Sequence, residues 1–202
     1  SGTAPRVDFL DREKVASFYL GQPWYHRSDT KLNRNDGTDI TLKNMGWDGD
    51  MLMPPIDGGV RYVDWFGPGG FMVDFLHNKA VARLGKGAHG RKLSNPVIET
   101  VETEGTLKGN PAPDKLKLTE LFDRLEFTHG QNMLLFGGVL RFSGLSPRIR
   151  PYAGIGAGVA VPHVEVWFKG EDLKNRTNEY QYAGPAVSTI AGVEFRLGRL
   201  SY

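Results

Sequence analysis

A chain of 202 residues without cysteine suits a single domain, and it cannot contain disulfides, thiolate metal sites or a cysteine nucleophile. Its formal net charge of +2 is too small to indicate a nucleic-acid partner. No run of about 18 apolar residues occurs, which excludes a transmembrane helix, whereas the 26 glycines and the 11% aromatic residues suit a β-rich chain.

The amino-terminal part divides into a tail and a first strand. Residues 1–12 are polar, contain a proline and show no periodicity, so we predict a flexible tail there and a single barrel domain over 13–202. Apolar and polar residues alternate from Lys14 to Tyr25, which is typical of a strand. Polar residues follow, with a short β-like stretch over Asp39–Lys43 and a turn-rich loop over Gly46–Pro55.

The next segments predict a hairpin and then a long connection. Gly58–Phe66 and Phe71–Ala82 both alternate, and the sequence Gly67-Pro68-Gly69-Gly70 between them is a tight turn. Residues 83–121 lose the alternation, and a connection of that length is usually functional or poorly ordered. Within it, Leu116–Phe122 fits a helical turn or two, or a β-extension.

Three more strands follow, over Asp123–Phe142, Ile149–Phe168 and Asn178–Leu197. Each is about 20 residues long, well beyond the usual length of about five or six. The connections alternate between long and short, and long loops at one rim with short turns at the other are typical of outer-membrane barrels. We therefore predict an all-β fold, namely an antiparallel up-and-down transmembrane β-barrel with long extracellular loops and short periplasmic turns.

A soluble lipocalin-like barrel is the alternative for such a meander, and it would place apolar residues in its lumen. The last segment alternates between an apolar and a polar set: Val187, Ala191, Val193 and Phe195 against Ser188, Glu194 and Arg196. Two charges inside a lipocalin cup would be costly unless they were paired, whereas narrow membrane barrels have polar lumens. We therefore expect the apolar set to face lipid and the polar set to face the lumen.

Closure of the barrel is a separate question, because six strands are readable and the smallest ordinary membrane barrel has eight. An open wall in lipid would leave unpaired backbone groups that cost several kcal/mol each. We expect either that the native chain continues past Tyr202 into a further hairpin, or that a second chain supplies the missing strands. Residues Arg199–Tyr202 resemble the start of such a strand.

Several short motifs occur in order along the chain: Gly46-Trp47-Asp48-Gly49 with Met53-Pro54-Pro55, then Phe122–Thr128, then Pro162–Val166, then Glu179–Tyr182 with Gly184–Val187. From about Ser17 to Leu197, this order and spacing resembles the lipid A oxidase-like outer-membrane barrels of rhizobia and other α-proteobacteria. The resemblance implies an eight-stranded barrel in the outer membrane of a Gram-negative cell. It also implies oxygen-dependent oxidation of the proximal glucosamine of lipid A to an aminogluconate unit, with peroxide as the by-product.

The candidate catalytic residues are polar side chains near the long-loop rim: His163, Glu165, Glu126, Glu179 and Tyr180. His163 and Glu165 are two apart on a strand and point to the same face, so they are the candidate metal ligands. The cofactor is unknown, and a divalent metal such as iron suits imidazole and carboxylate ligands. Glu126 and His129 face opposite ways unless a bulge intervenes. A hydrogen-bonded network that stiffens the long strands is the alternative interpretation of the same residues.

Basic residues gather in the long connection and are candidates for binding lipid phosphate: Arg83, Lys86, Arg91 and Lys92. Arginine and lysine meet phosphate through charge-assisted hydrogen bonds. A solvated loop without a ligand is the alternative.

Two functions remain open at this point. One is a lipid A-modifying oxidase that acts at the outer-leaflet rim. The other is a non-enzymatic barrel that serves as a structural element or anchor and binds lipopolysaccharide or a partner assembly. Both place the protein in the outer membrane, with lipid, lipopolysaccharide and a possible second chain as partners and without nucleic acid.

Overall fold

The computed structural model describes residues 12–51, 53–54, 56–142 and 148–195. Residues 1–11 of the predicted tail, most of the turn after Phe142, and the prediction for Arg196 and the residues after it lie outside this part of the chain. Arg12, predicted as the last residue of the tail, instead begins the first strand. Within it the protein is all-β, with antiparallel sheets and one wall that curls into a half-barrel.

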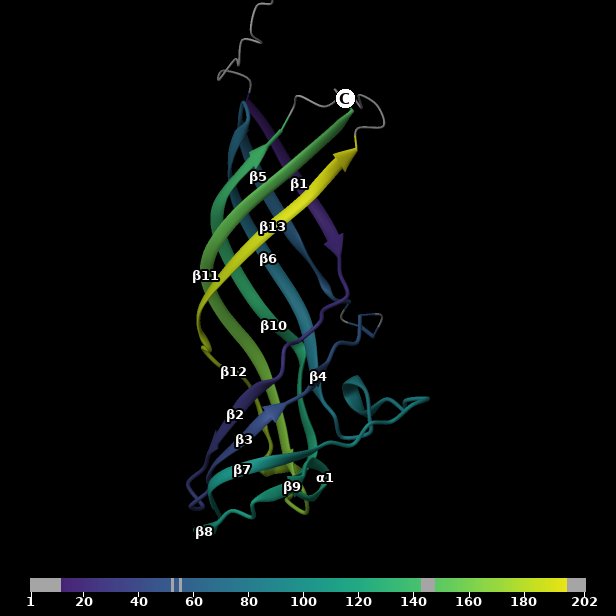
Figure 1. The fold of residues 1–202 in the computed structure, drawn as a ribbon, viewed down its shortest axis with the longest axis vertical. Coiled ribbons are helices and arrows are strands. Elements are labelled where there is room, and N and C mark those ends of the chain that lie inside the picture. The colour runs from purple at the N-terminus through teal and green to yellow at the C-terminus, as the bar shows by residue number, and fades with distance from the viewer. Residues whose placement is uncertain (1–11, 52, 55, 143–147, 196–202) are drawn as a thin grey trace, which may run out of the picture.

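Six antiparallel strands form that wall (Figure 1). In spatial order they are β1 (Arg12–Leu20), β5 (Gly58–Phe66), β6 (Gly69–Ala82), β10 (Phe122–Arg141), β11 (Ile149–Phe168) and β13 (Gly184–Phe195). The up-and-down order matches the prediction, and β11 has the predicted bounds. Short turns lie at one end of the wall and the long connections at the other, as the lengths of the connections predict.

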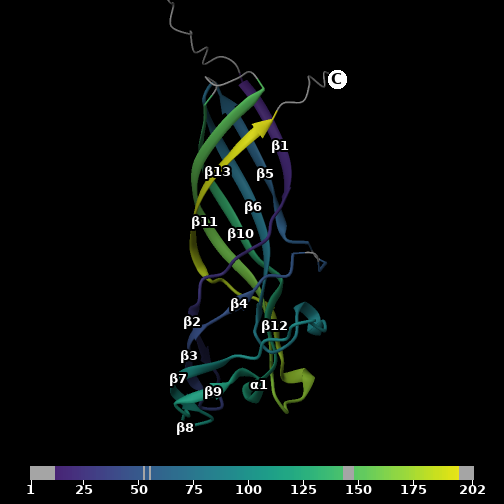
Figure 2. The ribbon, with the colours of Figure 1, turned by 45° about the vertical axis from the view of Figure 1, so that its right-hand side comes forward.

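A smaller sheet is built from the long connections and packs at the long-loop end (Figure 2). It contains β2 (Ser28–Asn33), β3 (Asp39–Met45), β7 (Thr100–Leu107), β8 (Asn110–Pro111) and β9 (Lys115–Lys117). The short strands β4 (Trp47–Asp48) and β12 (Thr177–Tyr180) pair with β6 and β11 instead. The connection over 83–121 is therefore largely ordered, and α1 (Leu118–Leu121) is the helical turn expected there.

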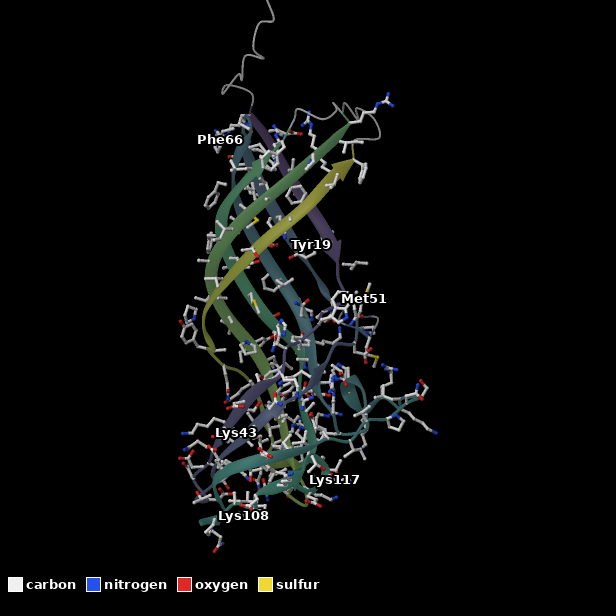
Figure 3. The ribbon with its side chains drawn as sticks, viewed as in Figure 1. Tyr19, Lys43, Met51, Phe66, Lys108 and Lys117 are labelled. Carbon is white, nitrogen blue, oxygen red and sulfur yellow. The ribbon has the colours of Figure 1, made fainter. Side chains whose placement is uncertain are left out.

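The main hydrophobic core lies between this small sheet and one face of the extended ends of β6, β10 and β11. Ile40 and Leu42 of β3 are fully buried there, together with Ala80, Leu125 and Val164 of the three wall strands. Figure 3 places Lys43, Lys108 and Lys117 at this end of the molecule and Phe66 at the turn end. The larger apolar core therefore lies beyond the curled wall, and a second, smaller cluster lies inside the curl.

The concave face of the wall carries paired polar groups beside the apolar cluster of Val63, Trp65, Met72 and Val139. The Tyr19 hydroxyl of β1 donates to the Asp74 carboxylate of β6 at 2.9 Å, and Arg61 pairs with the same carboxylate at 2.7 Å. Arg141 of β10 reaches Glu13 of β1 at 2.5 Å. Side chains from strands that are two or three places apart can meet only on the inside of the curl, so these pairs identify the lumen face.

The convex face is apolar and exposed. On β13, Val187, Ala191, Val193 and Phe195 are exposed, while Ser188 and Glu194 are partly buried. The predicted facing is therefore observed over the described part of this strand. The other wall strands present large exposed side chains on the same face: Phe18, Tyr62, Phe75, Phe136 and Ile155.

Neither edge of the wall is closed within the described residues. There β1 pairs with β5 and β13 pairs with β11, and no ladder joins β1 to β13. This agrees with the expectation that six strands do not close on themselves. What covers the two edges stays a prediction.

Two strand boundaries differ from the sequence predictions. The strand expected over Asn178–Leu197 is interrupted between Tyr180 and Gly184, where Gly184 adopts a φ of 117°. Four steps from Tyr180 to Gly184 correspond to three along β11, from His163 to Ala160, so one extra residue interrupts the regular pairing. The first strand ends at Leu20 rather than Tyr25; the Gly21 N–H still donates to the Asp57 carbonyl, one step further in the register with β5.

The helices are all short. Among the described residues, none is long and apolar enough to cross a membrane, and α1 has four residues.

Candidate functional site

A bulge in β10 brings a second histidine to the face that carries His163 and Glu165. Glu126 pairs with Glu165 and Gln131 pairs with Pro162, so five steps along β10 correspond to three along β11. Gly130 supplies the turn, with a φ of 102°. The two extra residues remove the strict alternation that would place His129 and Glu126 on opposite faces.

The three side chains meet closely. Nδ1 of His129 lies 2.5 Å from Oε1 of Glu165, and Nδ1 of His163 lies 4.0 Å from the same oxygen. The two imidazole rings are in edge contact, with centroids 4.8 Å apart. One ligand atom from each residue can be chosen so that all lie within 4.8 Å of one another. Two imidazoles and one carboxylate form the donor set of non-haem iron oxygenases.

The chemical states of these groups fit a metal. Nδ1 of His163 is buried and has no hydrogen-bond partner among the described residues, which is unusual for a buried polar atom. Burial, helped by the neighbouring His129, lowers the pKa of His163, so its imidazole is neutral. Burial opposes ionisation of Glu165, but hydrogen bonds from Arg124 and His129 outweigh it and hold the pKa of that carboxyl below its usual value. Neutral imidazole and ionised carboxylate are the forms that bind metals.

A second group of residues flanks the first. His89, in the turn η1 (Ala88–Gly90), lies 3.9 Å from Glu126 and could share a metal with Glu126 and Glu165. However, Arg124 already lies between the two carboxylates, 3.3 Å from Glu126 and 3.1 Å from Glu165. Burial raises the pKa of Glu126 to about 7, although Arg124 partly offsets this. Because the Arg124 guanidinium occupies the space between the carboxylates, His89 and Glu126 do not form a second metal site. Arg124 instead holds Glu165 in place.

The cluster lies on the convex face of the wall and not in the lumen. Alternate residues of β11 separate the two faces: Val164 and Val166 enter the main core, whereas His163, Glu165 and Trp167 point the other way. Toward the turn end, Val159 and Ile155 continue this outward face and are exposed. The polar cluster therefore borders the exposed apolar surface at its long-loop edge.

The predicted catalytic residues join the cluster to different degrees. Glu126, His163 and Glu165 come together, and Tyr180 lies opposite His163 in the ladder with its ring 4.7 Å from the imidazole. Glu179 does not join them. It alternates with Tyr180 along β12, lies opposite Val164, and accepts a hydrogen bond from Gln181.

The predicted phosphate-binding residues are partly occupied by other contacts. Arg83 pairs with Asp48 at 2.9 Å, and Arg91 pairs with Asp50 at 2.8 Å. These pairs connect the segment after β6 to β4 and to the loop that follows β4. Lys86 and Lys92 lie opposite each other in an isolated β-bridge. A role of this group in binding phosphate remains a prediction.

The sequence analysis left His129 and His89 out of the ligand set, and it allowed His129 to share a face with Glu126 only through a bulge. The signal for His129 was the glycine that follows it, which marks a bulge in a strand. His89 had no such signal, because it reaches the site through the folding of a connection, and it adopts an unusual φ of 53°.

Comparisons with protein-family models, with curated proteins and with solved structures found no match. Function is therefore argued from the cluster and its position on the wall.

Proposed function

We propose that this protein is an outer-membrane β-barrel enzyme that oxidises the sugar headgroup of lipid A at an iron site formed by His129, His163 and Glu165. The observation that carries the proposal is the position of this donor set, on the outside of the wall and next to the exposed apolar surface. A non-enzymatic barrel needs only a wall and does not require two imidazoles and a carboxylate within ligand distance of one another.

The dimensions of the apolar surface support a membrane location. On β11 the outward residues from Ile149 to Val159 are all apolar, and these positions span 11 residues (159 − 149 + 1). A tilted strand needs about 9–11 residues to cross the hydrocarbon core of a bilayer. His163 follows four residues later, which corresponds to the level of lipid headgroups. A lipid in the outer leaflet would reach the cluster sideways, without leaving the membrane.

The donor set supports an oxidation with dioxygen. His129, His163 and Glu165 would hold iron, and the metal would supply activation of dioxygen. His129 has 49% of its side chain exposed, so the cluster is open toward a substrate, whereas Glu165 is 4% exposed and held by Arg124. The protein thus offers a fixed carboxylate beneath an accessible imidazole.

The proposed reaction balances with dioxygen as the oxidant. The free C1 hydroxyl group of the proximal glucosamine loses its hydrogen and C1 loses its own, which gives a lactone. Dioxygen receives these two hydrogens and two electrons and leaves as hydrogen peroxide. Water then opens the lactone to the aminogluconate unit.

Mass spectrometry of lipid A tests this proposal. Cells that make the protein under aerobic growth should contain lipid A with one additional oxygen atom, and anaerobic growth should abolish the change. Glu165→Gln should abolish it as well, because it removes a ligand charge, whereas Glu102→Gln should not, because Glu102 lies in β7 of the small sheet. Unmodified lipid A in aerobic cells with confirmed expression would leave the non-enzymatic barrel as the function.

A further inference from the structure

Three exposed side chains form a row beside the cluster, on the outward face of β12 and the residue before it. Tyr180 lies opposite His163, and Asn178 lies opposite Glu165. Arg176 continues the row, with its guanidinium 5.5 Å from the centre of the Trp167 ring. All three row residues are exposed.

The other flank of the cluster is covered. His89 and its turn lie against Glu126, and Arg124 stacks on Trp167 at 4.1 Å. Glu126 and Glu165 are each less than 5% exposed as a result. A surface hollow lies instead along β12, lined by Lys174, Arg176, Asn178 and Glu179. A headgroup that reaches the cluster therefore lies along this row.

Arg176 differs from the other arginines around the site. Arg124 is paired with Glu126 and Glu165, and Arg34 is paired with Glu171. In the part of the chain that the structure describes, Arg176 has no carboxylate within 4.0 Å, and its contact is the Trp167 ring. Stacking on an indole holds a guanidinium in place without using its N–H donors, and its planar fork matches two phosphate oxygens.

We propose that this row is a headgroup subsite in which Tyr180 packs against the reacting sugar and Arg176 binds a phosphate on the same headgroup. The inference rests on the proposed function, since it uses the same cluster. Arg176 lies two residues from the position opposite Glu165, or about 7 Å along the strand, which is about the length of one sugar ring. The reaction takes a hydrogen from the C1 hydroxyl, so the phosphate is carried on a carbon other than C1.

The test is a set of calorimetric titrations of the metal-free, folded protein in detergent micelles. The ligands are glucosamine 6-phosphate, glucosamine and inorganic phosphate. The unmodified protein should prefer glucosamine 6-phosphate to both of the others. Arg176→Gln should weaken binding of the phosphorylated sugar by about tenfold or more and leave glucosamine binding unchanged, since a charge-assisted contact is lost.

Matched variants test whether binding depends on the row residues and not on side chains elsewhere. Lys31→Gln should change none of the three affinities, because Lys31 lies in β2 of the small sheet and is paired with Asp39 at 3.2 Å. Tyr180→Ala should weaken binding of both sugars, whereas Tyr182→Ala, at an exposed tyrosine beyond the end of β12, should not. Retention of the folded band on unheated gels shows that each variant has assembled.

The outcomes distinguish this inference from the oxidase proposal. Equal affinity of unmodified protein and Arg176→Gln for glucosamine 6-phosphate would overturn the phosphate subsite, even if lipid A is oxidised. If inorganic phosphate binds as tightly as glucosamine 6-phosphate, the proposed packing of Tyr180 against the sugar is overturned. Discrimination that depends on Arg176 and Tyr180 would support the subsite, even if lipid A proves to be unmodified.

Discussion

Nδ1 of His129 lies 2.5 Å from Oε1 of Glu165, although the two residues are 36 positions apart and belong to different strands. The contact exists because β10 carries two residues more than β11 across the bulge. A regular ladder would have placed His129 on the core side, where Phe127 packs. The chemistry proposed for the site therefore depends on a local irregularity of the backbone.

The first prediction concerns metal binding by the three ligands. Co²⁺, as a spectroscopic substitute for iron, should bind with a stoichiometry of one per chain. Glu165→Gln or His163→Gln should weaken Co²⁺ binding by about 100-fold or more, since loss of groups that only hydrogen-bond to metal ligands already costs about 10–100-fold. A titration followed by visible absorption measures this. His77→Gln is the control, because His77 pairs with Asn132 outside the ligand set. Unchanged Co²⁺ affinity in both ligand variants would eliminate the site.

The second prediction concerns the bulge itself. In Gly130→Ala, the new Cβ would lie 2.2 Å from Nδ1 of His77, and the φ of 102° disfavours any side chain. His129 should therefore be displaced, and Co²⁺ affinity should fall although all three ligands remain. The strain should also lower the free energy of unfolding by about 1–3 kcal/mol. Gly138→Ala is the control, since its nearest neighbour is 4.0 Å away. Co²⁺ affinity equal to that of the control would show that the bulge does not position His129.

The wall was predictable because alternation along a strand is a local pattern. The bounds of β11 were predicted to the residue, and those of β10 to within one residue at each end. The shared face of His163 and Glu165 followed from the same local pattern. By contrast, His129 and His89 reach the cluster through non-local contacts. Alternation along one strand does not predict a bulge in its pairing or the path of a connection. Alternation also does not predict whether the cluster faces the lumen or the outside, because this depends on which face of the wall strands the small sheet covers.

The third prediction concerns the apolar outer face. Ile155 is 65% exposed and lies midway along the apolar stretch of β11, whereas Phe195 lies at the turn end of β13, opposite Ile149. Arginine at a lipid-facing midplane position costs about 2–4 kcal/mol and at an interface about 0–1 kcal/mol. Ile155→Arg should thus impair folding into vesicles much more than Phe195→Arg. Ile155→Leu keeps the side chain apolar and should fold normally. Equal folding of both arginine variants would contradict a membrane-facing surface.

The fourth prediction concerns the two open edges, β1 and β13. The chain has no cysteine, so engineered pairs can be oxidised without background. Ala153→Cys with Ala191→Cys is the positive control, because these residues are directly paired and disulfides need Cα atoms about 4.4–6.8 Å apart. Cysteine at Ala16 should form no disulfide with cysteine at Val187, Ala191 or Val193 in the membrane-assembled protein. All four residues are exposed on the outward face, so an opposite orientation of the side chains would not be the reason for a missing disulfide.

A six-stranded wall has little room for inward side chains such as Arg61 and Tyr19, which occupy the concave face. Further strands are therefore expected between the two edges. Efficient cross-linking between Ala16→Cys and any of the three β13 positions would instead show that six strands close on themselves.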